Sequence, residues 1–285
     1  MIIDGKKCSE EILENLRKDI SEYKEKTGKV PGLAVIILGN NAASKIYVKS
    51  KIRACEKTGI LSREIILDEN ISEEELINEI EKLNNDKNIN GILVQLPLPS
   101  HINEKKICEA ISVKKDVDGF KAENLGKIML GDDDGFISCT PQGIIYLIDQ
   151  LNMDLHGKNV VVVGRSNIVG KPVASLLINK GATTTVCNSR TKDLAGILKK
   201  ADIIVIAIGK AKFLTKDMVK EGAVVIDVGI NRVDGKIYGD VDYENVKDIV
   251  SHITPVPGGV GPMTIAMLLK NTVKAFCKEE LVNGN

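Results

Sequence analysis

The stretch Val160-Val161-Val162-Val163-Gly164-Arg165-Ser166-Asn167-Ile168-Val169-Gly170 decides the fold. Its four valines predict a buried strand, which breaks at a glycine and is followed by a helix. In that geometry, backbone N–H groups and the helix N-terminus face an anion, which is how the pyrophosphate of a dinucleotide is held. The two glycines do not follow the order G-x-G-x-x-G, so a plain strand-to-helix turn explains this loop alone equally well.

Strands and helices alternate on both sides of this loop. In the C-terminal half, strands are predicted over residues 159–163, 183–187, 203–207 and 224–228, and helices over 169–180, 191–200 and 264–278. In the N-terminal half, strands are predicted over 33–38, 63–67 and 91–95, and helices over 8–23, 42–57 and from the capping box Ser72-x-x-Glu75. This alternation implies α/β domains whose mostly parallel sheets are covered by helices on both faces.

A further helix begins at Thr140-Pro141, where a capping hydroxyl precedes a proline at the first helical position. We interpret this helix as the bridge between two domains. The 285 residues are enough for two domains of ordinary size.

The charge balance argues against polyanionic partners. Lys and Arg together number 39, as do Asp and Glu, and the two signs are interspersed along the chain. The longest apolar runs, such as residues 203–208, are far shorter than a membrane-spanning helix, and the N-terminus lacks the apolar region of a signal peptide. We therefore expect a cytoplasmic protein that binds neither nucleic acid nor membrane.

The six cysteines and three histidines are scattered, without a C-x-x-C pair or another metal-ligand spacing. They indicate reduced thiols and no metal site. A buried thiol packed as a small hydrophobe is the ordinary role of such a cysteine. A role as nucleophile stays possible only for Cys139, because this cysteine lies beside the helix start at Thr140-Pro141.

The end of the strand 183–187 bears on which dinucleotide would bind. An NAD enzyme places Asp or Glu there, on the ribose hydroxyls, whereas this chain reads Asn188-Ser189-Arg190-Thr191. Ser189 and Arg190, together with Arg165 of the first loop, could hold a 2′-phosphate by charge-assisted hydrogen bonds. This favours NADP over NAD, although Arg190 could also be a solvated residue at a helix start.

A second candidate site lies in the N-terminal half. Tyr47 and Lys51 are four residues apart, so they share one face of the predicted helix 42–57, which follows the strand that ends before Gly39. Ligand crevices of open α/β sheets lie at such strand ends. Taken alone, a Tyr/Lys pair of this kind is more often a surface feature than a catalytic pair.

Three further segments change that weighing: Gln95-Leu96-Pro97-Leu98-Pro99, Lys115-Asp116-Val117-Asp118-Gly119-Phe120, and Pro255-Val256-Pro257-Gly258-Gly259-Val260-Gly261-Pro262-Met263-Thr264. Together with Tyr47-x-x-x-Lys51, Thr140-Pro141-Gln142-Gly143 and the loop from Gly164 to Pro172, their order and spacing resemble the bifunctional methylenetetrahydrofolate dehydrogenase/cyclohydrolase family. The resemblance covers nearly the whole chain.

This resemblance implies a role for each matching residue. Lys51 would be the catalytic group, with Gln95 bonded to it and Tyr47 lining the folate ring pocket as part of the catalytic set. Asp118 would hold the amino edge of the pterin, and Gly261-Pro262 would pack on the ligand as a turn. Gly164, Arg165, Ser166, Ser189 and Ile230 match the family's NADP contacts, and Arg190 joins them from the strand end described above.

The same resemblance implies the domain plan and the activity. Residues 1–139 would form an N-terminal α/β catalytic domain that binds folate, completed by a returning helix 264–285, and residues 140–263 a Rossmann-like NADP-binding domain. The enzyme would oxidise methylenetetrahydrofolate with NADP, hydrolyse the methenyl product, and form a homodimer. Two alternatives stay open: another two-domain NADP oxidoreductase, similar to shikimate dehydrogenase, and a non-catalytic NADP-binding sensor.

Two short segments depart from the family pattern. The family has Gly-Asp-Asp/Asn-Pro-Ala-Ser where this chain has Gly39-Asn40-Asn41-Ala42-Ala43-Ser44, and Pro-Cys-Thr-Pro where it has Ser138-Cys139-Thr140-Pro141. Neither departure removes a reacting side chain. Both bear on loop geometry rather than on chemistry.

Overall fold

The computed structural model describes residues 1–39 and 42–283. They fall into two compact units, which we describe separately. Unit 1 comprises Met1–Ser9, Ile128–Asp132 and Thr140–Thr264. Unit 2 comprises Glu10–Lys127, Asp133–Cys139 and the described residues from Ile265 onward.

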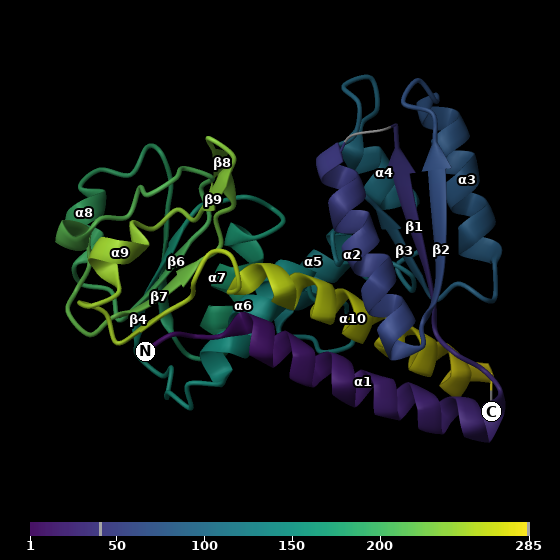
Figure 1. The fold of residues 1–285 in the computed structure, drawn as a ribbon, viewed down its shortest axis with the longest axis horizontal. Helices are drawn as coiled ribbons and strands as arrows, with labels where there is room; N and C mark the ends of the chain where they lie inside the picture. The colour runs from purple at the N-terminus through teal and green to yellow at the C-terminus, as the bar shows by residue number, and fades with distance from the viewer. Residues whose placement is uncertain (40–41, 284–285) are drawn as a thin grey trace. The chain divides into compact units, whose positions relative to one another are not determined.

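Unit 2 is built on a three-stranded parallel sheet in the order β2-β1-β3 (Figure 1). The strands are β1 (Gly32–Leu38), β2 (Leu61–Leu67) and β3 (Gly91–Val94). Val35 of the central strand pairs with Glu64 on one side and Leu93 on the other. Because β1 is covered on both faces, its sequence is a continuous apolar run rather than an alternating one.

Helices cover both faces of this sheet. On one face, Ala34 and Ile36 of β1 pack in a buried cluster with Leu76 and Ile80 of α3 (Glu73–Asn85) and with Ile107 of α4 (Glu104–Ala110). Side chains alternate along a strand, so Leu33, Val35 and Ile37 face the opposite side, where β1 contacts α2 (Ala42–Thr58). The other long helices are α1 (Gly5–Thr27) and α10 (Val260–Asn283).

The capping box predicted for α3 is confirmed. The Ser72 hydroxyl accepts a hydrogen bond from the Glu75 amide, and the Glu75 carboxylate accepts one from the Ser72 amide. The prediction missed α4 and α5 (Ala122–Leu130), which are too short to show a clear apolar period.

Unit 1 contains a five-stranded parallel sheet in the order β10-β7-β6-β4-β5. Its strands are β4 (Asn159–Val163), β5 (Thr183–Cys187), β6 (Ile203–Ile206), β7 (Val224–Asp227) and β10 (His252–Ile253). Helices α6 (Cys139–Asp149) and α7 (Gly170–Asn179) belong to this half of the chain, together with the short α8 (Leu194–Leu198) and α9 (Tyr243–Val246). The expected two-domain α/β architecture with parallel sheets is confirmed.

The structure corrects two predicted helices of this half. The helix expected over 191–200 is reduced to α8, because Asp193 adopts a left-handed conformation and its side chain caps the Gly196 amide. The last helix begins at Val260 rather than at 264. Gly261 and Pro262 therefore lie in the first turn of α10 and not in a turn before it, a position that proline tolerates because its missing N–H has no intrahelical partner there.

A two-stranded antiparallel hairpin follows β7 and was not predicted. It consists of β8 (Asn231–Val233) and β9 (Lys236–Tyr238), with Asp234 and Gly235 at the turn. Among the described residues, no helix is long and apolar enough to cross a membrane.

Candidate active site

Lys51 and Gln95 meet at the end of the unit 2 sheet. Lys51 lies on α2, and its Nζ donates a hydrogen bond of 3.0 Å to Oε1 of Gln95, the first residue after β3. The Gln95 side chain is oriented by a second bond, from its Nε2 to the carbonyl of Leu96 at 2.8 Å. The Gln95 amide also bonds to the carbonyl of Ile36 in β1, so the acceptor of the lysine is fixed to the sheet.

Asp118 and Cys139 lie close enough to Lys51 to influence its charge. Burial lowers the pKa of Lys51 below its ordinary value, and the Asp118 carboxylate only partly opposes this effect. Burial also raises the pKa of Asp118, which is opposed by the Lys51 ammonium and by a hydrogen bond from the Cys139 thiol. A lysine with a lowered pKa can exchange protons nearer to neutral pH than an exposed lysine can.

The structure argues against Cys139 as a nucleophile. The thiol is buried, contacts the carbonyl of Val117 at 3.4 Å, and has a pKa raised well above 9.0 by burial and by the neighbouring Asp118. Since the thiolate is the reactive form, this cysteine is an unreactive, protonated hydrogen-bond donor.

Tyr47 lies one turn before Lys51 on α2 and is 42% exposed. An exposed aromatic ring beside a partly buried lysine can cover a flat ligand. The departure from the family pattern at residues 39–44 includes Asn40 and Asn41, which lie outside the described residues, and no structure is assigned to them. The second departure, Ser138, is buried, and its hydroxyl donates to the Gly119 carbonyl at 2.8 Å. It thereby helps to hold the loop that carries Asp118.

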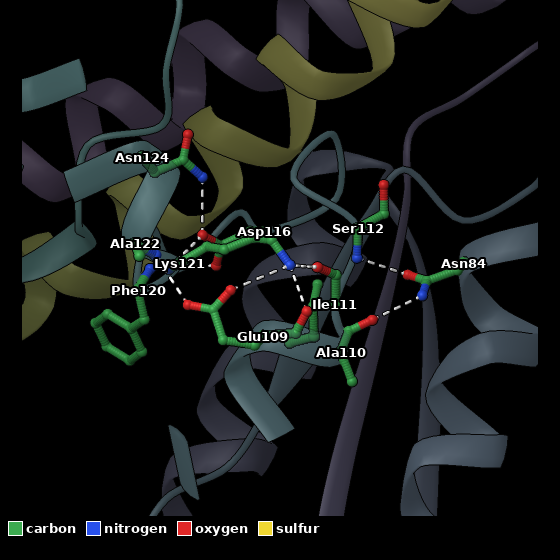
Figure 2. Close-up of polar contacts among 10 residues, drawn as sticks. All are labelled: Asn84, Glu109, Ala110, Ile111, Ser112, Asp116, Phe120, Lys121, Ala122 and Asn124. Carbon is green, nitrogen blue, oxygen red and sulfur yellow. Dashed lines mark hydrogen bonds and ion pairs between the residues drawn. The ribbon is translucent and has the colours of Figure 1, made fainter. Parts of the chain in front are cut away.

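A buried carboxylate that the sequence analysis did not single out organises this loop. Asp116 accepts hydrogen bonds from the amides of Phe120 at 3.2 Å and Lys121 at 2.8 Å, and from the Asn124 side chain at 2.8 Å. Figure 2 shows these bonds converging on Asp116, and Lys121 reaching the carbonyls of Glu109 and Ile111. The turn that contains Asp118 is therefore tied both to the start of α5 and to the end of α4.

In unit 1, Gly164 and Gly170 form a tight turn between β4 and α7. Gly164 has a φ of +129°, and a Cβ on Gly170 would lie 2.2 Å from the Gly164 carbonyl oxygen. Only glycine fits either position. The Ser166 hydroxyl accepts hydrogen bonds from the amides of Val169 at 3.2 Å and Gly170 at 3.3 Å, just before and at the first residue of α7. The turn brings backbone amides to the start of a helix, as the sequence predicted.

Ser189 and Arg190 stand next to this turn. Strands β4 and β5 are paired, with Val163 opposite Cys187, and the Gly164 amide bonds to the Cys187 carbonyl. The exposed side chains of Arg165, Ser189 and Arg190 therefore lie at one edge of the sheet, at the carboxyl ends of two neighbouring strands. Asp193, the nearest carboxylate along the chain, is occupied as the cap of α8.

The remaining predicted residues also belong to unit 1. Ile230 follows β7 and is 47% exposed. A Cβ on Gly261 would lie 3.9 Å from the Ile230 side chain, so the start of α10 lies beside it. The Pro262 carbonyl accepts a hydrogen bond from Ser9 at 3.1 Å.

Unit 2 also has a cavity of about 730 Å³, but no predicted site residue lines it. Its wall includes Asn84, Lys115, Phe136 and Lys278, and the Lys115 ammonium is already bonded to two carbonyls. The cavity is therefore separate from the cluster around Lys51.

Comparison with known proteins identifies two domain families in this chain. Residues 3–118 match the catalytic domain of tetrahydrofolate dehydrogenase/cyclohydrolase, and residues 138–280 match the NAD(P)-binding domain of the same family. This chain belongs to the tetrahydrofolate dehydrogenase/cyclohydrolase family. The resemblance stated from the sequence motifs is thus confirmed.

Individual members of the family are similar over almost their full length. The bifunctional protein FolD of Francisella philomiragia is 56% identical, with 98% of this chain and 99% of that protein covered. The crystal structure of the Campylobacter jejuni FolD enzyme is 51% identical, with a TM-score of 0.96 over 98% of this chain and 99% of that one. The Trypanosoma brucei enzyme, solved in complex with NADP and an inhibitor, is 36% identical with a TM-score of 0.94, covering 98% of each chain.

Proposed function

We propose that this member of the tetrahydrofolate dehydrogenase/cyclohydrolase family oxidises 5,10-methylenetetrahydrofolate with NADP and then hydrolyses 5,10-methenyltetrahydrofolate to 10-formyltetrahydrofolate. The observation that carries the proposal is the partly buried amine of Lys51, held by Gln95 and close to Asp118. The catalytic set is Lys51, Gln95 and Tyr47.

Two side chains, those of Asp118 and Tyr47, would be the main contacts of the folate. Asp118 would accept hydrogen bonds from the amino edge of the pterin, and Tyr47 would lie along the ring. Gly261 and Pro262 would pack against the ligand. Residues 1–139 with the returning helix would then be the folate-binding part, and residues 140–263 the NADP-binding part.

The residues of unit 1 fit a dinucleotide with a 2′-phosphate. The glycine turn at Gly164 lets the backbone approach a pyrophosphate, and Ser166 and Ile230 would contact the cofactor. Arg165, Ser189 and Arg190 would hold the 2′-phosphate, since the end of β5 carries no carboxylate that would repel it. When NADP is bound, it supplies the acceptor for the hydride of the methylene group.

Lys51 would handle the protons of the hydrolytic step. Its amine takes a proton from the water whose oxygen bonds to the methenyl carbon. The resulting ammonium gives that proton to the ring nitrogen as the carbon–nitrogen bond breaks. The hydroxyl proton is released as the formyl carbonyl forms, so one water is consumed and one proton leaves. Gln95 keeps the Lys51 nitrogen in place throughout.

Location and assembly are part of the same proposal. We place the enzyme in the cytoplasm, where its six cysteines would stay reduced. We also propose a homodimer. The family resemblance supports this assembly, and sedimentation of the purified protein would test it.

The decisive assay follows NADPH formation from methylenetetrahydrofolate and the decay of methenyltetrahydrofolate with the purified chain. We expect both reactions, with no oxidation of shikimate. NADP binding without either reaction would leave only a non-catalytic sensor. Oxidation of shikimate instead would favour the other two-domain oxidoreductase.

A further inference from the structure

A buried carboxylate in unit 1 is surrounded by backbone amides that donate to it. Asp240 accepts hydrogen bonds from three consecutive backbone amides, those of Ile208 at 2.7 Å, Gly209 at 3.0 Å and Lys210 at 2.7 Å. Successive amides pointing at one place form an anion-binding nest. The side chain of Asn231 adds a fourth donor at 2.9 Å. Asp240 is 0% exposed, so this nest is filled from within the protein.

A second buried carboxylate, Asp227 at the end of β7, completes the arrangement. It accepts hydrogen bonds from the amides of Gly229 at 3.0 Å and of Asp240 and Val241, both at 2.9 Å. The packing leaves no space: a Cβ on Gly239 would lie 1.8 Å from a carboxylate oxygen of Asp227, and one on Gly229 would lie 2.2 Å from an oxygen of Asp240. Asp227 and Asp240, which we call the carboxylate clamp, thus join the loop after β6 to the loop after β7.

These loops lie at the edge of the sheet where the dinucleotide would bind. The sheet order places β5 on one side of β4, and β6 and β7 on the other. Ser189 and Arg190 at the end of β5 mark the position of the 2′-phosphate, and therefore of the adenosine half. The two halves of a dinucleotide lie over opposite sides of such a sheet. The nicotinamide half would then lie over the loops after β6 and β7, which include the exposed Ile230.

We propose that Asp240, supported by Asp227, is a positioning residue for the nicotinamide half of NADP. It fixes the amides of residues 208–210 and holds Asn231, the neighbour of Ile230, so that the surface facing the nicotinamide is preformed. Because Asp240 consumes the donors of the nest, the phosphates of the cofactor are left to the Gly164 turn. This inference rests on the proposed NADP-binding function.

The test measures how tightly the full chain with Asp240→Asn binds the whole cofactor and its adenosine half. This substitution keeps the side-chain size but replaces one acceptor oxygen by a donor. NADP and adenosine 2′,5′-bisphosphate serve as calorimetric probes, and hydrolysis of methenyltetrahydrofolate, which consumes no NADP, reports on unit 2. Asp248→Asn removes the same charge at an exposed site after α9 and is the matched control.

We expect Asp240→Asn to raise the Kd for NADP by at least about tenfold, the loss of one or more hydrogen bonds to a charged group. The Kd for adenosine 2′,5′-bisphosphate and the hydrolysis should change less than about twofold, within the range of substitutions remote from the contact. Asp248→Asn should match wild type throughout. An unchanged Kd for NADP in Asp240→Asn, or an equal weakening of both ligands, would overturn the inference, since the second result describes a general loss of structure.

If Asp240→Asn does not fold, Asn231→Ala tests the inference instead, because it removes only one of the four hydrogen-bond donors to Asp240. Weaker NADP binding with unchanged binding of the bisphosphate supports the clamp, and unchanged NADP binding refutes it. Failure of the proposed function itself would be recognised first, in a wild-type chain that neither binds NADP nor hydrolyses methenyltetrahydrofolate.

Discussion

At the scale of single residues, Lys51 combines burial with a fixed hydrogen-bond partner. Lys51→Met keeps the length and packing of the stem and removes the proton-exchanging amine. We expect the cyclohydrolase rate to fall by about 10²–10⁴-fold, the usual size of general acid–base help. The dehydrogenase rate should fall less, because hydride transfer needs no proton from the enzyme. Methenyltetrahydrofolate decay, corrected for its uncatalysed hydrolysis, and NADPH formation measure the two effects. Hydrolysis near the wild-type rate would reduce Lys51 to a binding residue.

The lowered pKa of Lys51 also predicts the effect of pH. The neutral amine is the base, so cyclohydrolase kcat/KM should rise with pH and level off at a pH below 10.5, the ordinary value for lysine. Folding lowers this pKa. The contribution of Lys51 to stability is therefore complete above 10.5 and is lost as the pH falls through the lowered value. At pH 7, Lys51→Met should consequently unfold at the same temperature as wild type or higher. A clearly lower Tm would contradict this sign.

Asp118 is expected to act in binding rather than in one chemical step. A carboxylate on the pterin amino edge contacts ground and transition states alike, so Asp118→Ala should raise the KM for folate in both reactions by roughly 10–100-fold, as for loss of a charged hydrogen-bonding partner. The Kd for NADP should change little. Normal folate affinity in the variant would show that Asp118 only stabilises the turn in which it lies. This alternative is open because the next residue, Gly119, has the positive φ of +72° that is common in turns.

At the scale of elements, the start of α5 determines how firmly the Asp118 loop is held. Asp116→Asn replaces a buried oxygen that accepts an amide hydrogen by an NH₂ group, which breaks part of the network in Figure 2. We expect unfolding to become easier by about 1–3 kcal/mol, the cost of leaving a buried donor unpaired, and the folate KM to rise while the Kd for NADP stays constant. Urea unfolding and steady-state kinetics give the two values.

The partly exposed pair Glu73 and Lys106 supplies a control for that experiment. Glu73→Gln weakens an ion pair between α3 and α4 that is partly exposed, with a distance of 2.7 Å. Such pairs contribute about 0–1 kcal/mol, so this variant should leave the folate KM unchanged. A rise in KM equal to that of Asp116→Asn would mean that general loosening of unit 2, and not the position of the loop, sets folate affinity.

At the scale of the whole molecule, cofactor choice should be visible as ligand-linked stability. A ligand that binds only the folded state stabilises it by about 2.7 kcal/mol at a concentration of 100 times its Kd. With two or three charge-assisted bonds to the 2′-phosphate, we expect NADP to raise the Tm by several degrees and NAD at the same concentration to raise it much less. The same difference should appear as roughly a hundredfold in kcat/KM. Equal responses to both cofactors would refute the role given to Ser189 and Arg190.

Much of the architecture could be read from local sequence. The valine run before Gly164, the capping box of Ser72 and Glu75, and the apolar run of β1 each predicted an element that the structure contains. Their signals are local, because strand burial, helix capping and glycine conformations depend on residues within a few positions. The pairing of Tyr47 and Lys51 on one helix face followed from helical spacing in the same way.

The sequence alone therefore determined the fold class and the family motifs, and it indicated Lys51 as the candidate for proton transfer. Only the tertiary structure decided that Cys139 is an unreactive thiol donor, that Asp116 holds the Asp118 loop, and that Asp227 and Asp240 join the loops after β6 and β7. The physical reason is that these properties depend on burial and on partners brought together by the fold. An aspartate in a sequence carries no sign of whether its oxygens will face water or a set of backbone amides.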